Sequence, residues 1–262
     1  SYSRIWQPFH LLSNTSAGVP ADYRIPAMRI APPSTSNQAT VSLEFAPDYS
    51  EYRCTIEAYY KEMKNLADLK EGVTYTIDYS DWGKMLATNG KGKAKGIEAL
   101  IRKEQGSSTG SIGFSIANSK RQFNDLNDGV EYPYKYDRLF DFGCLFQQQI
   151  SKNLSASAIW VFGTGMPYNI PRSYYEDING NHVLVYGSLN QFRQKAYHRL
   201  DVGLSYKVHF RKAVGNFDFS IINVYNRRNP HLYRTTSSDW GVRLWEFSMF
   251  PILPTLSYTV KY

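Results

Sequence analysis

The sequence predicts an all-β fold, an antiparallel meander of about ten strands that crosses a membrane as part of a transmembrane β-barrel. Three observations lead to this prediction. Apolar and polar residues alternate with a period of two in most segments, as in strands with two different faces. The connections between these segments alternate strictly between short and long. No stretch of the 262 residues approaches the roughly 18 consecutive apolar residues that indicate a transmembrane helix.

The clearest strand covers residues 200–210. Leu, Val, Leu, Tyr, Val and Phe occupy its even positions, and Asp, Gly, Ser, Lys and His occupy the odd ones. Residues 256–262 repeat the pattern. No convincing helix is predicted, since alternation explains the first half of the partly helical pattern at 59–70. The same criterion predicts ten strands, at residues 1–9, 38–46, 51–63, 95–104, 107–121, 136–150, 153–163, 195–210, 214–229 and 242–262.

The connections between these strands fall into two classes. Short turns are expected near 47–50, 105–106, 151–152 and 211–213. Long loops are expected near 10–37, 64–94, 122–135, 164–194 and 230–241. Strict alternation puts all short turns at one end of the sheet, as in outer-membrane barrels with short periplasmic turns and longer extracellular loops. A soluble all-β domain is the alternative, but it has no reason to sort its connections in this way.

The two faces of the strands predict what each one contacts. Even-numbered apolar residues at 200–210 and 256–262 are expected to face lipid, and their odd neighbours the barrel lumen. Aromatic residues near strand ends are expected to form interfacial girdles: Tyr136, Trp160, Tyr197 and Trp245. Small inward residues such as Gly203 and Ser205 suit a wide barrel with something inside it. At this spacing a 22-stranded barrel would need roughly 580 residues.

The domain prediction follows from this count. Residues 1–262 are expected to form a single C-terminal portion of a 22-stranded outer-membrane β-barrel, with the plug and the N-terminal strands absent. The runner-up is a complete small outer-membrane barrel that acts as a pore, an adhesin or a surface protease. A soluble carbohydrate-binding β-domain is the third possibility.

Five segments carry a resemblance to a known family: Ile56–Leu66 (IEAYYKEMKNL), Gly90–Leu100 (GKGKAKGIEAL), Tyr197–Gly203 (YHRLDVG), Asn223–Pro230 (NVYNRRNP) and Phe250–Tyr258 (FPILPTLSY). In this order and spacing they resemble the C-terminal barrel segment of TonB-dependent outer-membrane receptors, of the type common in Bacteroidetes. The aromatic residue Tyr262 resembles the family's C-terminal assembly signal, where Phe is commoner.

The resemblance implies a function in nutrient import. Such receptors bind a scarce nutrient at the cell surface, such as a siderophore, cobalamin, haem or an oligosaccharide, and TonB then pulls on the plug. The expected partners are outer-membrane lipid and lipopolysaccharide, the remainder of the barrel and plug, TonB through the absent plug, and a small-molecule or oligosaccharide ligand. No nucleic acid is expected: the net charge is +7, but Lys and Arg are scattered rather than gathered on one face.

Three long loops contain the candidate ligand-binding residues. They combine aromatic rings, which stack on sugars or siderophore rings, with polar or charged side chains. Packing between loops and interfacial anchoring are the structural alternatives for each of them. The candidates are Tyr79, Asp81 and Trp82 in the second loop, Tyr174, Tyr175 and Glu176 in the fourth, and Tyr233, Arg234, Asp239 and Trp240 in the fifth.

The basic segment Gly90–Gly96 (GKGKAKG) lacks the spacing of a phosphate-binding P-loop. It is interpreted as a flexible, basic loop end that leads into a strand. A second interpretation is that Lys91, Lys93 and Lys95 meet lipopolysaccharide phosphates at the outer surface.

No enzyme, cofactor or metal site is predicted. The five histidines lack the spacing of a zinc site. Those expected in outer loops, His10, His182 and His231, would be solvated or would capture haem or a metal. A protease-like Asp/His pair, Asp177 with His182 or Asp239 with His231, is the enzymatic alternative, but nothing in the sequence orients either pair. Cys54 and Cys144 lie in the apolar phase of non-neighbouring strands and are expected to be lipid-facing thiols.

Overall fold

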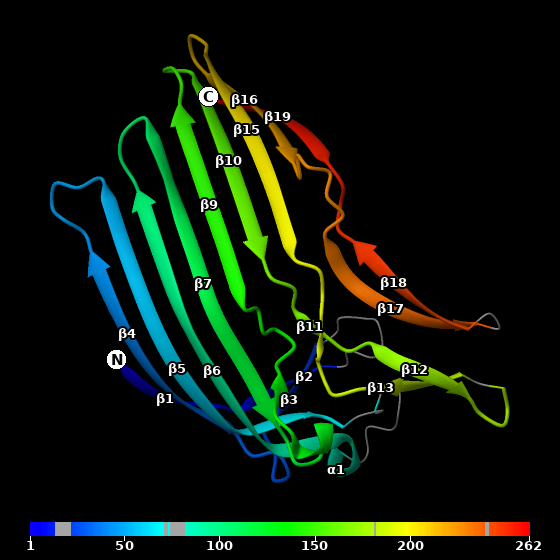
Figure 1. Cartoon of the computed structure of the whole chain (residues 1–262). Coiled ribbons are helices and arrows are strands. Elements are labelled where there is room, and N and C mark those ends of the chain that lie inside the picture. Colours follow the sequence, from blue (N-terminus) through cyan, green and yellow to red (C-terminus); the bar gives the residue numbers. More distant parts are fainter. Residues whose placement is uncertain (14–21, 71–72, 74–81, 181, 239–240) are drawn as a thin grey trace.

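The chain forms one large antiparallel sheet with a layer of small hairpins at one end (Figure 1). The computed structural model describes residues 1–13, 22–70, 73, 82–180, 182–238 and 241–262. Ten strands follow one another in the order β1-β4-β5-β6-β7-β9-β10-β15-β16-β19, and short β8 pairs with β7. Within the described residues, β1 and β19 are each paired on one side only, so the sheet is open. The predicted meander of about ten strands is confirmed.

Each of the ten predicted segments overlaps one of the ten main strands, and β8 lies in a predicted loop. The strands of the sheet are β1 Tyr2–Gln7, β4 Ser34–Phe45, β5 Tyr52–Leu69, β6 Leu86–Lys103, β7 Ser108–Gln122, β8 Tyr132–Pro133, β9 Phe140–Gln149, β10 Leu154–Gly163, β15 Tyr197–His209, β16 Val214–Ile222 and β19 Leu253–Lys261. The turns β4–β5, β6–β7, β9–β10 and β15–β16 all lie at the upper end in Figure 1, and the long connections lie at the lower end. The predicted sorting of connections is therefore confirmed.

The long connections, predicted as loops, have secondary structure of their own. They contain four two-stranded hairpins: β2 Phe9–Ser13 with β3 Asp22–Pro26, β11 Pro167–Tyr168 with β14 Phe192–Arg193, β12 Pro171–Glu176 with β13 His182–Tyr186, and β17 Pro230–Ser238 with β18 Gly241–Ser248. They also contain a one-turn helix, α1 Trp82–Met85, and a 3-10 turn, Asn127–Gly129. The prediction of no helix was thus wrong at these two short turns.

Three predicted boundaries were wrong. The segment 242–262 is two strands, because residues 241–248 pair with β17 rather than continuing in the large sheet. The segment 214–229 ends as a strand at Ile222, because Asn223 and Asn226 adopt left-handed backbone conformations with φ of 58° and 54°. The loop 64–94 is shorter than predicted, because β5 runs to Leu69 and β6 starts at Leu86.

The large sheet has an apolar outer face. Cross-strand register places Ile56, Ala99 and Phe114 in one row, with Phe142 next to them. Large apolar side chains on this face are exposed, for example Leu43 at 71% and Leu256 at 74%. The opposite, concave face carries Gly203 opposite Ser157, and Ser205 opposite Asp218. The phase predicted for 200–210 and 256–262 is the phase observed.

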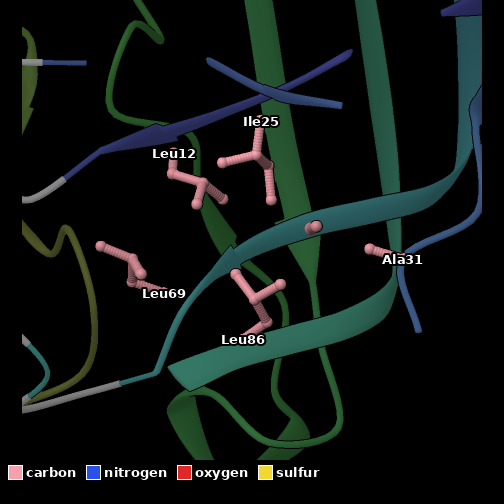
Figure 2. Close-up of a cluster of buried hydrophobic side chains, with 6 residues drawn as sticks. Leu12, Ile25, Ala31, Leu69 and Leu86 are labelled. Carbon is pink, nitrogen blue, oxygen red and sulfur yellow. The ribbon is translucent and has the colours of Figure 1, made fainter. Parts of the chain in front are cut away.

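The buried core lies in the outer layer instead. One cluster joins the hairpin β2–β3 to the outer ends of β5 and β6 (Figure 2). It contains Leu12, Ile25, Ala31, Ala67, Leu69 and Leu86. A second cluster contains Leu66, Ala87, Phe123, Leu126 and Tyr132. Register shifts between Met63 and Asp68 interrupt the pairing of β5 with β6 near the position where these clusters begin. Such bulges bend strands, so they help the outer ends turn over the core.

Polar side chains fix the connections within this layer. Asp137 is 1% exposed, accepts a hydrogen bond from the backbone of Ser119 and pairs with Arg193, which also donates to the carbonyl oxygens of Asp137 and Gly165. Asn223 and Asn229 are buried as well. Asn223 receives an N–H from Arg227, and Asn229 exchanges two hydrogen bonds with the backbone of His198.

The structure also shows the surroundings of the two cysteines and of His10. Cys54 and Cys144 are free thiols on β5 and β9, which are separated by β6 and β7. His10 is not solvated, since it is 4% exposed and its Nε2 donates to the carbonyl oxygens of Ala31 and Pro32 at 3.2 and 3.1 Å. Among the described residues, no helix has the length and hydropathy that a membrane span requires.

Candidate functional site

The candidate residues of the second loop lie at or beyond the edge of a described range. Tyr79 and Asp81, together with Asp239 and Trp240 of the fifth loop, lie outside the described residues. Trp82 is the first residue of α1, and its side chain is not described. The structure therefore tests the surroundings of the candidates on the fourth loop and of two on the fifth.

The fourth loop presents its three candidates on the hairpin β12–β13. Tyr174 and Glu176 share one face of β12, and Tyr175 lies on the other face, opposite Val183. His182 is opposite Glu176 and meets the ring of Tyr174 edge-on, with centroids 4.9 Å apart. Tyr174 and Tyr175 are 47% and 57% exposed. The hairpin thus offers two accessible aromatic rings with a carboxylate and an imidazole beside one of them.

The Asp177 and His182 pair belongs to the same hairpin. The Asp177 carboxylate accepts the backbone N–H of Asn179, and its carbonyl accepts the N–H of Gly180. Asp177 therefore forms the turn between β12 and β13, as Asp commonly does. No cluster of three or more potential metal ligands occurs among the residues that the structure describes.

The fifth loop buries one candidate. Tyr233 on β17 is 4% exposed, its hydroxyl donates to Glu246 Oε2 at 2.8 Å, and its carbonyl accepts the hydroxyl of Tyr168. Burial, reinforced by Glu246, raises the pKa of Tyr233 to about 12. Hydrogen bonds to its carboxylate, from Lys195 first and from Tyr233 to a smaller extent, lower the pKa of Glu246. Tyr233 consequently anchors β17–β18 to the fourth loop.

The exposed face of β17–β18 carries the other candidate. Arg234 is opposite Trp245, whose Nε1 donates to Thr236 at 2.8 Å, and Thr236 is opposite Arg243. The two arginines and the indole therefore share one face. Sequence reasoning missed Arg243 and assigned Trp245 to an interfacial girdle, because it placed residues 242–248 in the membrane-spanning sheet. The turn-forming Gly241, with φ of 101°, was the available signal for a hairpin.

The fourth loop, with strands β11 to β14, packs against the hairpin β17–β18 of the fifth loop. The rings of Tyr168 and Tyr233 lie 5.5 Å apart, and the ring of Phe192 meets Tyr233 edge-on at 6.0 Å. A Cβ atom on Gly241 would lie 2.9 Å from the hydroxyl of Tyr174. The start of β18 thus lies close to a candidate side chain of β12, and the described parts of the fourth and fifth loops form one neighbourhood.

The concave face of the sheet has a charged hollow of about 880 Å³. Glu57 on β5 is directly opposite Glu98 on β6, and two rows away on the same face Arg53 is opposite Arg102. Arg138 pairs with Asp141 at 2.8 Å, but among the described residues neither Glu57 nor Glu98 forms an ion pair. Like charges directly opposite one another destabilise a strand pair, so this wall carries charge that its own residues do not neutralise.

An open meander with an apolar outer face, a charged inner face and long connections gathered at one end is the wall of an outer-membrane β-barrel. The model of the family "TonB dependent receptor-like, beta-barrel" matches residues 1–226, and the chain belongs to this family. Its members are outer-membrane receptors and transporters rather than enzymes. The expected family, location and non-enzymatic class are confirmed.

Solved structures share the fold. The ferric-catecholate import receptor Fiu of Escherichia coli K12 is 14% identical with a TM-score of 0.58, over 98% of this chain and 32% of its own. The ferripyoverdine receptor of Pseudomonas aeruginosa is 12% identical with a TM-score of 0.57, over 99% and 30%. The iron transporter FrpB of Neisseria meningitidis is 13% identical with a TM-score of 0.51, over 89% and 31%. The chain thus spans about a third of these structures. A search of curated proteins finds no match.

Proposed function

We propose that the chain is the C-terminal portion of a 22-stranded TonB-dependent receptor of the Bacteroidetes type, which binds and imports a scarce nutrient. The observation that supports this most strongly is the open sheet, in which β1 and β19 each have one unpaired edge within the described residues. Unpaired edges are aggregation sites unless other strands cover them. The remaining strands of a larger barrel would pair with both.

The inner wall is proposed to face the plug. Glu57 and Glu98 lie opposite each other on adjacent strands, and neither forms an ion pair among the described residues. A cationic side chain from a plug would neutralise both, and removal of either glutamate would then weaken plug seating. Energy coupling through TonB belongs to that plug in this proposal.

The outer hairpins are proposed to contact the nutrient. Arg234, Arg243 and Trp245 form a cationic and aromatic face, which suits a ligand with anionic and planar groups, such as a ferric siderophore. Tyr174 and Tyr175 suit stacking on a sugar ring, and Glu176 can accept hydrogen bonds from sugar hydroxyls, so an oligosaccharide is the second candidate. Cobalamin and haem are further candidate nutrients in this proposal. The proposal also includes the remaining candidates predicted from the sequence: Tyr79, Asp81, Trp82, Asp239 and Trp240.

The first experiment is the mass of the native chain in purified outer membranes, detected with an antibody against the loop around Tyr174. A band well above 30.1 kDa supports a receptor. A membrane band at that mass, without a co-purifying partner, contradicts it and favours the small self-closing barrel.

The second experiment tests the ligand surface in the full-length receptor. The variant R234A/W245A should weaken binding of ferric siderophores about tenfold or more, because buried Trp and Arg contacts dominate most binding interfaces. The control R211A changes an exposed arginine at the opposite end of the strands and should bind normally. Unchanged affinity in R234A/W245A would remove this hairpin from the site.

A further inference from the structure

The segment Gly90–Gly96, interpreted above as a flexible loop end, is a regular part of β6. Its lysines and small residues alternate across the two faces of the strand, so that Lys91, Lys93 and Lys95 are exposed and Gly90 and Gly92 are buried. The lysines share a face with Ile97 and Ile101, because all of them occupy odd positions of one strand. They therefore continue the outer, lipid-side surface of the sheet beyond its apolar band.

Packing on the inner face fixes this orientation. A Cβ atom on Gly90 would lie 2.3 Å from the ring of Phe123, and one on Gly92 would lie 2.9 Å from the side chains of Leu66 and Met63. A shift of the register by one residue would drive lysines into this core and expose the glycines. The direction of the three lysines is consequently set by the fold rather than by a mobile loop.

The register also locates the lysines relative to the membrane. Lys95 stands opposite Tyr60, an exposed aromatic residue of the kind that marks a membrane interface. The next row toward the turn end is apolar, with Ala58, Ile97 and Ile116. Lys93 and Lys91 lie two and four residues further out, about 7 and 14 Å along the strand. The lysines thus begin where the apolar band ends, on the side of the long loops.

Neighbouring strands add charge to this surface. Lys93 is directly opposite Lys120 on β7, and Lys64 of β5 lies on the same face. The nearby acids are Glu131, which pairs with Lys120 at 2.9 Å, and Glu62, which stands opposite Lys93 and accepts the hydroxyl of Tyr60. Within the described chain, Lys64, Lys91, Lys93 and Lys95 form no ion pair. Such a cluster, with two lysines opposite each other, is stabilised by an anion.

We propose that Lys91, Lys93, Lys95, Lys64 and Lys120 form a binding site for the phosphate groups of lipid A in the outer leaflet. Lysine binds phosphate as a compact point charge, and basic residues next to an apolar span attract anionic headgroups. This inference rests on the proposed placement of the long loops at the cell surface. It adds a partner on the outer wall, separate from the nutrient site on the hairpins.

The test uses the full-length receptor in detergent, titrated with bisphosphorylated lipid A. The variant K91Q/K93Q/K95Q should lose roughly a hundredfold in affinity, since it removes three cations from the headgroup region. The control K152Q/R211Q/K212Q removes the same charge from exposed turns at the opposite end of the strands and should bind like the natural chain. Monophosphorylated lipid A should bind more weakly, and millimolar inorganic phosphate should not displace the lipid.

Two results would overturn the proposal: equal lipid A affinity in the triple variant and the natural chain, or displacement of lipid A by inorganic phosphate. The variant K91R/K93R/K95R keeps the charge and should retain binding, and the single variant K93Q should show a partial loss if the triple variant does not fold. Siderophore binding in the same preparations separates the two proposals, because a change at the lysines should leave it intact.

Discussion

The membrane-spanning sheet and the outer layer of this chain solve opposite packing problems. In the sheet, large apolar side chains such as Leu43, Val41 and Leu256 point outward and stay exposed. In the outer layer, Leu12 and Phe123 are fully enclosed, and the buried hydrophobic residues of the described chain gather there or at the outer strand ends. The difference reflects the solvent: lipid replaces a core for the sheet, whereas the layer in water needs its own core.

The largest effect is expected from a substitution in the buried core of the outer layer. Replacing Phe123 with Ala should cost about 3–5 kcal/mol locally, because it leaves a cavity among Leu66, Ala87 and Tyr132. Hydrogen exchange in the full-length receptor should then accelerate at the outer ends of β6 and β7. The control Phe146→Ala changes a lipid-side ring that is 47% exposed and should leave exchange in the outer layer unchanged. Equal acceleration in both variants would contradict the comparison.

A smaller effect tests the two faces of the sheet directly. Leu204 lies on the outer face and Ser205 on the inner face, where its hydroxyl bonds to Asn216. Leu204→Arg should destabilise the barrel by roughly 2–4 kcal/mol if it lies near the midplane, and Ser205→Arg should cost little. Unfolding by urea in phospholipid vesicles measures both. Equal tolerance at the two positions would refute the membrane assignment.

Removing one polar anchor of the outer layer should have a weaker effect. Tyr233→Phe deletes the hydrogen bond to Glu246 and should cost about 1 kcal/mol, as for other single hydrogen bonds. Limited proteolysis of the hairpin β17–β18 should become faster. Tyr175→Phe, at a ring that is 57% exposed, is the matched control and should show no change. Normal protease resistance in Tyr233→Phe would mean that apolar packing alone holds the hairpin.

The smallest effect concerns pH. Glu246 has a lowered pKa, so its contribution is present above the ordinary value of 4.5 and is lost as pH falls through its folded pKa. Tyr233 has its pKa raised from 10.0 to about 12, so the folded hairpin keeps a proton that the unfolded chain releases, and stability falls over that interval. Fluorescence of Trp245 should report both limbs. Glu246→Gln should flatten the acid limb, and an unaltered acid limb would exclude Glu246.

Sequence determined much of the sheet, because alternation records the two solvents that each strand separates. Residues 200–210 show this in full, and their faces are those observed. The sorting of the connections followed from the lengths of the segments between strands. Sequence could not separate β18 from β19, since residues 241–248 alternate in the same way whether they pair with a barrel strand or return along β17.

The tertiary structure alone decided the outer layer. Whether Tyr233 contacts a ligand or anchors a hairpin depends on Tyr168, Lys195 and Glu246, which come from three separate segments. Likewise, Lys91, Lys93 and Lys95 became an ordered surface only because Phe123 and Leu66 pack against the intervening glycines. The alternation of one strand records which solvent each face meets, but it carries no information about which distant residues cover that face.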